Sequence, residues 1–320
     1  MNSMLTLDAL TRLADPLADR TVAAIVGPWQ DAQQPGPQAL ARLSAATRLM
    51  TQWRDNASLA DWYPGNDGAD PALVDILRDY LREGSRLPLW ADSALIARAE
   101  TIFMQEGPLS CTLLFCASLP ECYVPPQLAE VLHVAGQLEA HTEHRIRQTA
   151  AMVFPVMLKG GLTDPAGCGI AQVLKVRLIH ATIRHLILHG DPAQVSGMVE
   201  ANPGHGSAPG SHGALHEALM AHGWDIDRRG LPCNQFELAY TLLTFHFVFL
   251  RGMRTLGLGL PRADEDAFLH AWNVVVTCWA CATTCCPRTL TRRPPPSSGC
   301  RRSVARRPLH PTRDRVSGRR

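Results

Sequence analysis

The chain has 320 residues, of which 46% are hydrophobic, and its formal net charge is +2. These values are typical of a globular protein that is long enough to bury a sizeable core. Residues 277–320 carry eleven Arg, no Lys and one acid, so this tail has a charge of about +10 and residues 1–276 a charge of about −8. Because the basic balance comes from the tail, we expect no specific nucleic-acid partner for the rest of the chain.

The ten cysteines do not follow a disulfide pattern, because five are scattered through apolar or loop segments and five fall in the tail. The N-terminus has neither the basic region nor the long apolar run of a signal peptide. The longest apolar runs, residues 109–119 and 236–250, are shorter than the ~20 residues that a membrane span needs. We therefore expect a cytoplasmic protein without a transmembrane helix.

Helical periodicity dominates the first 120 residues. Asp70 followed by Pro71 is a favourable helix start, because Asp caps the first turn and Pro fits its first position. Residues 109–119 are apolar on nearly every side, which predicts a central buried helix. The patterns predict helices over residues 1–35 (one or two short ones), 39–53, 71–82, 92–105 and 109–119.

The same periodicity continues in the second half, so the sequence predicts an all-α fold. Residues 190–213 are rich in Gly, Pro, Ser and His and predict a mobile excursion. Helices are predicted over residues 125–158 (kinked near Pro155), 169–188, 234–256 and 262–275.

The predicted helix over residues 169–188 carries the main candidate site. His180 lies beside an apolar stripe, and Arg177 and Arg184 lie one turn before and after it on the same face. Two neighbouring cations disfavour the imidazolium, and a neutral imidazole is the form that binds a metal. The guanidiniums could bind cofactor carboxylates, or they could form buried structural ion pairs, and the sequence leaves both open.

After residue 276 the composition changes to a mixture of Arg, Pro, Ser and Cys without apolar periodicity. Such a segment buries too little surface to offset the entropy of ordering, so residues 277–320 are predicted to be disordered. A GC-rich gene read in a shifted frame gives this mixture, and we favour that interpretation of the tail.

Several segments, in their order and spacing, resemble the oxygenase family of latex clearing proteins (rubber oxygenases) and MpaB-type enzymes. The main ones are Arg145-x-x-x-Thr149 and Arg177-x-x-His180-x-x-x-Arg184, and further resemblance lies at residues 107–123, 231–235, 241–245 and 270–272. The resemblance divides the chain into an N-terminal helical extension (1–60), an oxygenase domain (61–276) that the tail leaves C-terminally incomplete, and the tail (277–320).

The resemblance implies a globin-like multi-helix bundle in which His180 is the axial ligand of the iron of haem b. It implies that Arg145 and Thr149 lie beside the haem as catalytic residues, and that the enzyme uses dioxygen to cleave a carbon–carbon double bond of a hydrophobic, isoprenoid- or lipid-like substrate. Latex clearing proteins have a Lys where this chain has Gln148. Their glutamate has no clear counterpart here, because Glu130 is close but out of phase and Glu139 lies further off.

Two other classes of function remain open on the sequence. The first is a non-enzymatic helical protein in which His180 and its neighbours only pack. The second is a His-ligated metal hydrolase built on His212, His216 and Glu217, although Met220 stands where the zinc-protease pattern needs another ligand.

Overall fold

The computed structural model describes residues 7–27, 37–65, 68–134, 142–190 and 218–278, and every regular element named among them is a helix. The predicted all-α, multi-helix fold is confirmed. The α-helices are α1 (Leu7–Thr11), α2 (Pro16–Val26), α3 (Pro37–Met50), α4 (Pro71–Gly84), α5 (Ser93–Gln105), α6 (Gly107–Leu113), α7 (Leu119–Glu121), α8 (Pro126–Val134), α9 (Thr142–Met157), α10 (Gly169–His189), α13 (Ile226–Arg229), α14 (Gln235–Leu243), α15 (Phe249–Thr255) and α16 (Arg262–Cys278).

Shorter helical segments complete the fold. One 3₁₀ turn, η1, covers Ala57–Leu59. Two segments are π-helical: η2 (Leu114–Ser118) joins α6 to α7, and η3 (Thr244–Val248) joins α14 to α15. The two π-helical segments pack against each other.

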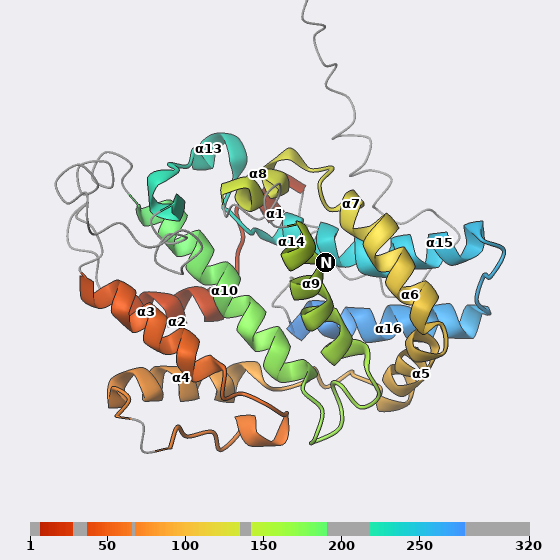
Figure 1. Ribbon diagram of the computed structural model, residues 1–320, viewed down its shortest axis with the longest axis horizontal. Coiled ribbons are helices and arrows are strands. Elements are labelled where there is room, and N and C mark those ends of the chain that lie inside the picture. The colour runs from red at the N-terminus through yellow and green to blue at the C-terminus, as the bar shows by residue number, and fades with distance from the viewer. Residues whose placement is uncertain (1–6, 28–36, 66–67, 135–141, 191–217, 279–320) are drawn as a thin grey trace, which may run out of the picture.

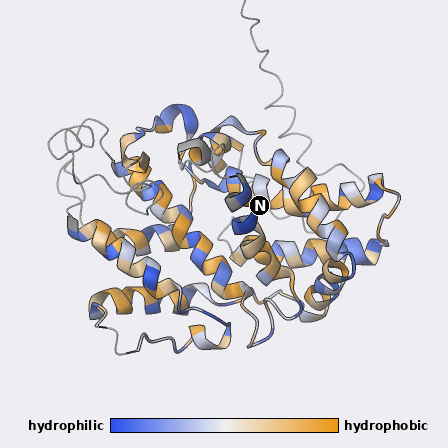
Figure 2. Ribbon diagram, in the orientation of Figure 1, coloured by the Kyte–Doolittle hydropathy of each residue, from blue (hydrophilic) through white to orange (hydrophobic). Residues whose placement is uncertain are grey.

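Helix α10 crosses the middle of the molecule (Figure 1). It packs against α2 and α9, while α16 packs mainly against α5 and also contacts α10. In Figure 1, α2, α3 and α4 lie toward one end, and α5, α6, α15 and α16 lie toward the other. Most helices carry both hydrophobic and hydrophilic residues (Figure 2), as expected for helices that bury one face.

The loop between α9 and α10 is held by polar side chains from distant parts of the chain. The Asn56 amide nitrogen donates to the carbonyl oxygens of Gly161 and Asp164, each at 2.9 Å, and its amide oxygen accepts from the backbone N–H of Ile170 at 3.1 Å. The buried carboxylate of Glu100 accepts from the backbone N–H of Gly160 at 2.8 Å. These bonds fix where α10 begins, and hence where its side chains lie.

Some predicted helix ends are wrong. Helix α4 continues through Gly84, where the sequence predicts an end at residue 82. A Cβ at Gly84 would lie 2.7 Å from the Leu174 side chain, so this glycine allows α4 to approach α10 closely rather than ending the helix. Helix α16 continues through Thr277 and Cys278, which are the first two residues of the predicted disordered tail. Cys278 is buried.

The prediction of a buried helix over residues 109–119 is also only partly right. The helix begins at Gly107, because Pro108 suits the first turn, and it becomes π-helical at Leu114. Thr112 and Cys116 are exposed, so this helix has one solvent face. The predicted long helix over residues 125–158 corresponds to α8 and α9, and Pro155 lies inside α9. The predicted excursion at 190–213 and the tail from 279 lie outside the described residues.

Among the described helices, none is by itself long and apolar enough to cross a membrane. One bent pair, Ser93–Gln105 with Gly107–Glu121, meets the length and composition test together, with an angle of 88° between its two parts.

Candidate functional site

His180 lies in the middle of α10, between Arg177 and Arg184. Burial, together with the positive charge of Arg184, lowers the pKa of His180 to about 4. The imidazole is therefore neutral at physiological pH, and a neutral imidazole has a lone pair to offer a metal ion. This agrees with the protonation state expected from the sequence.

A small cavity lies beside the imidazole, with space for about one water molecule. It is lined by Asp15, Arg177, His180, Arg184 and Leu238. Three helical segments thus meet at this point: the start of α2, the middle of α10 and the first half of α14. The cavity brings together three of the residues that the sequence analysis singled out.

Arg177 is held in a buried ion pair. Its Nε and Nη2 donate to the two carboxylate oxygens of Asp15 at 2.7 and 2.9 Å, and its Nη1 donates to the carbonyl oxygen of Cys278 at 2.9 Å. Asp15 also caps α2 by accepting from the backbone N–H of Ala18 at 3.1 Å. All three guanidinium nitrogens are therefore occupied, and one residue joins α10 to α2 and α16.

Arg184 is held in the same manner. Its Nε and Nη2 both donate to Oδ1 of Asp19, and its Nη1 donates to the carbonyl oxygen of Cys233 at 2.9 Å and more weakly to that of Pro232 at 3.2 Å. Cys233 has a φ of 51°, an uncommon conformation for a residue other than glycine. The sequence left two roles open for these arginines. In the structure, Arg177 and Arg184 both form structural ion pairs.

The other predicted residues are less close to this cavity or less well described. Thr149 lies in α9 and is partly exposed, and it is not among the residues that line the cavity. Arg145 also lies in α9, but its side chain is outside the described residues. Glu130 forms an ion pair with Arg229 and lies 3.4 Å from Nε2 of His222, and Glu139 lies outside the described residues.

The residues of the alternative metal hydrolase, His212, His216 and Glu217, lie outside the described part of the chain. Within the described ranges, no group of three or more His, Cys, Asp or Glu side chains is placed to hold a metal ion. A site with one protein ligand, as an axial histidine would be, does not require such a group.

Three acidic residues of this region did not emerge from the sequence analysis. The sequence contains one usable signal for Asp15, which precedes Pro16 at a helix start as Asp70 precedes Pro71. The sequence contains no such signal for Asp19, because only the packing of α2 on α10 brings this residue to Arg184. Glu237 is buried near Arg184 with no hydrogen bond to either carboxylate oxygen among the described residues, and burial raises its pKa to about 7.

The fold agrees with that of a known protein family. The profile of the family described as ER-bound oxygenase mpaB/B'/Rubber oxygenase, catalytic domain, matches residues 112–292, which is more than half of the chain. The chain belongs to this family. The match includes all of α10 and extends past residue 276, where the sequence predicts the oxygenase domain to end.

Two relatives define the extent of the similarity. The rubber oxygenase of Streptomyces sp. (strain K30) is 25% identical over 224 residues, which are 68% of this chain and 46% of that protein. The structure of latex clearing protein LCP in the closed state has a TM-score of 0.63 at 20% identity, over 90% of this chain and 63% of that one. This chain thus spans less than two thirds of the length of either relative.

The family resemblance implies haem, which needs a nitrogen ligand, a sufficiently large pocket and partners for two propionates. The axial donor fits, because His180 is neutral and lines a cavity. The volume does not fit, because the space beside His180 that can hold a water-sized sphere is only about 10 Å³, enough for about one water molecule and far too little for a macrocycle. The two nearby guanidiniums are already bound by Asp15 and Asp19 rather than open to propionates. In this conformation the site has a neutral histidine but no space for a haem macrocycle.

Proposed function

We propose that the chain is an oxygenase that adds dioxygen across a carbon–carbon double bond of a hydrophobic, isoprenoid- or lipid-like substrate. We further propose that it uses haem b and that His180 would hold its iron. The observation that carries the proposal is a neutral, largely buried histidine between two arginines, on a helix inside the region that matches the oxygenase family.

The chain's own residues would hold the reactants and control their environment. Burial and the charge of Arg184 keep His180 unprotonated. Leu238 and the core around α14 keep water away from the site. We assign Arg145 and Thr149 as the polar residues beside the reacting atoms. When bound, haem supplies the dioxygen chemistry itself.

The proposal requires the cavity beside His180 to widen. Asp15 and Asp19 belong to the cap and first turn of α2, and they hold that helix against the two arginines. If α2 moved away, the cavity would open and both guanidiniums would be freed at once. Arg177 and Arg184 could then bind the haem propionates, which would replace the two aspartates with other carboxylates.

One observation favours the alternative, a helical protein without enzymatic activity. Every guanidinium nitrogen of Arg177 and Arg184 is hydrogen-bonded to protein, as in a finished structural core. Under this alternative His180 only packs against its neighbours.

An assay of oxygen uptake separates the two functions. The full chain, supplied with haem, is mixed with squalene, a polyunsaturated isoprenoid hydrocarbon, under ¹⁸O₂. The proposal predicts oxygen consumption and carbonyl products that carry ¹⁸O, detected by mass spectrometry. Squalane, the saturated hydrocarbon with the same carbon skeleton, is the matched control and should give neither. Equal uptake with squalane, or no labelled product from squalene, would contradict the proposal.

A further inference from the structure

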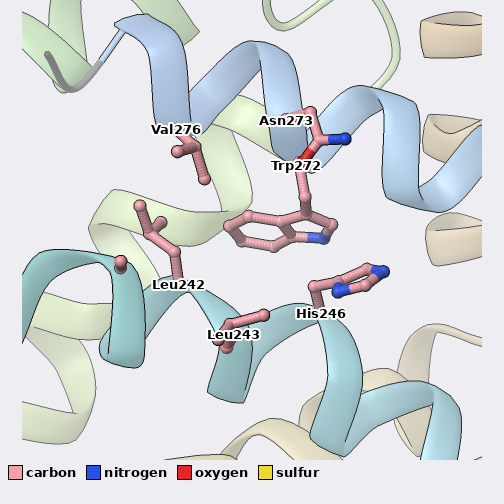
Figure 3. Close-up of a pocket in the computed structure, with 7 residues that line it drawn as sticks. Leu242, Leu243, His246, Trp272, Asn273 and Val276 are labelled. Carbon is pink, nitrogen blue, oxygen red and sulfur yellow. The ribbon is translucent and has the colours of Figure 1, made fainter. Parts of the chain in front are cut away.

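His270 lies in α16, on the side of that helix that meets the start of α5. Trp272, two residues later, points into a small cavity beside His246, between α16 and the α14–η3 helix (Figure 3). Two residues turn an α-helix by about 200°, so His270 lies on the other side of α16. There its ring contacts the segment that leads into α5, the helix against which α16 mainly packs.

The imidazole of His270 is bonded to the backbone where α5 begins. Its Nε2 accepts a hydrogen bond from the backbone N–H of Asp92 at 2.8 Å. The indole of Trp90 meets the imidazole edge to face, with the ring centroids 5.6 Å apart and the ring planes at 85°. A backbone N–H can only donate, so Nε2 must carry a lone pair. The ring is therefore neutral here, with its proton on Nδ1.

This bond completes the cap of α5. Asp92 is the N-cap, and its carboxylate accepts from the backbone N–H groups of Ala94 and Leu95 at 2.8 and 3.2 Å. In a capping box, a Glu or Gln three residues after the cap accepts in return from the N–H of the cap residue. That position is Leu95, which has no side-chain acceptor. His270 supplies the acceptor from α16 instead, so a contact between two helices takes the place of a local one.

The charges around His270 leave this bond dependent on pH. Burial lowers the pKa of His270 below its usual 6.5, and the carboxylate of Asp92 opposes this shift more weakly. Further along the same two helices, Arg98 of α5 and Asp264 of α16 neutralise each other through two hydrogen bonds of 2.7 Å. Helices α10 and α14 and the segment η3 also pack on α16, and within the described ranges no charge from them acts on His270.

We propose that His270 is an acid-sensitive clasp that ties the start of α5 to α16 through the backbone N–H of Asp92. When Nε2 takes up a proton it becomes a donor, and two donors cannot bond to each other. The clasp is closed above pH 6.5 and opens as the pH falls through the pKa of His270 in the folded chain, which lies lower. It acts on the start of α5 rather than on the cavity beside His180, so this inference goes beyond the proposed oxygenase function and does not depend on it.

Nuclear magnetic resonance of the full chain labelled with ¹⁵N at aspartate tests the proposal. The backbone N–H signal of Asp92 is assigned by its loss in Asp92→Ser, which keeps a good N-cap residue. Its exchange with water, corrected for the intrinsic effect of pH, should become about tenfold faster between pH 7.5 and pH 5, because one hydrogen bond is lost. The N–H of Asp70, the N-cap of α4, is the internal control, and its corrected exchange rate should not change.

Two variants complete the test. His270→Gln offers an amide oxygen that accepts at any pH, so the Asp92 N–H should stay protected at both pH values. His270→Phe keeps a ring beside Trp90 but has no acceptor, so the exchange should already be about tenfold faster at pH 7.5. The proposal is overturned if the corrected rate of the unmodified chain does not rise at pH 5, if His270→Gln shows the same rise, or if His270→Phe leaves the rate at pH 7.5 unchanged.

Discussion

At the scale of single residues, the ion pair of Arg177 with Asp15 is the most constrained contact of the site. The side chains are only 7% and 4% exposed, and two parallel hydrogen bonds join them. A buried pair of this kind adds little net stability over an apolar pair. Removing one partner, however, leaves an uncompensated charge in the core and costs about 3–5 kcal/mol.

The change Asp15→Asn should therefore lower the free energy of unfolding by several kcal/mol, measured by urea denaturation. Asn retains the capping ability of Asp, so the loss reports the ion pair rather than the cap of α2. The double variant Asp15→Asn/Arg177→Met should be less destabilised than the sum of the two single variants. Glu143→Gln, which removes an exposed pair with Arg147, is the control and should change stability little. Strictly additive effects would show that the pair is not coupled.

Also at this scale, the sequence identified His180, Arg177 and Arg184 as neighbours on one helix face, because their spacing is local. It could not tell which carboxylates the arginines would meet. Asp15 and Asp19 are more than 160 residues away along the chain, and no periodicity connects them to α10. His246 was not singled out for the same reason, since only the packing of α14 and η3 on α16 gives its ring a cavity.

At the scale of helices, local signals predicted starts better than ends. The predicted start at Pro71 is correct, because it rests on a cap: the side chain of Asp70 accepts the backbone N–H of Ala72. The helix predicted from residue 234 begins at Gln235, because Asn234 is its N-cap. The predicted end before Gly84 is wrong because contact with Leu174, rather than helix propensity, sets the role of that glycine. Tertiary contacts of this kind are invisible in a local pattern.

The two π-helical segments also escaped prediction. The sequence predicts continuous helices over residues 109–119 and 234–256, and it contains no signal for the extra residue in each. The segments meet in the fold, where the thiol of Cys122 and the hydroxyl of Thr244 lie 3.1 Å apart beside them. The contact between η2 and η3 arises from the packing of helices that are distant in the sequence. The local sequence pattern carries no information about such packing.

At the scale of the whole molecule, buried titratable groups make stability depend on pH. Burial lowers the pKa values of His180, His185 and His246 from 6.5 to about 4, with added charge effects from Arg184 and His189 on the first two. Between pH 6.5 and 4, the unfolded chain therefore binds up to three more protons on these histidines than the folded chain does. Glu237 opposes them, because burial raises its pKa from 4.5 to about 7 and the folded chain holds that proton.

The net effect of these four groups is about two protons, so stability should fall as the pH drops from 6.5 to 4.5, by about 3 kcal/mol per pH unit at its steepest. Urea denaturation at a series of pH values measures this slope. Glu237→Gln removes the opposing group. The slope should then become steeper by about 1.4 kcal/mol per pH unit, which corresponds to one proton. A stability that is flat or rises over this pH range would show that the histidines are not buried in their neutral form.

The central claim is that His180 binds haem iron, and absorption spectroscopy of the purified full chain titrated with haem tests it most directly. The unmodified chain should develop an intense Soret band that saturates at one haem per chain, and His180→Ala should lose it. His189→Ala, on the exposed end of the same helix, should retain the band. If no saturable band forms, or if His180→Ala keeps the same band as the unmodified chain, then His180 is not the iron ligand.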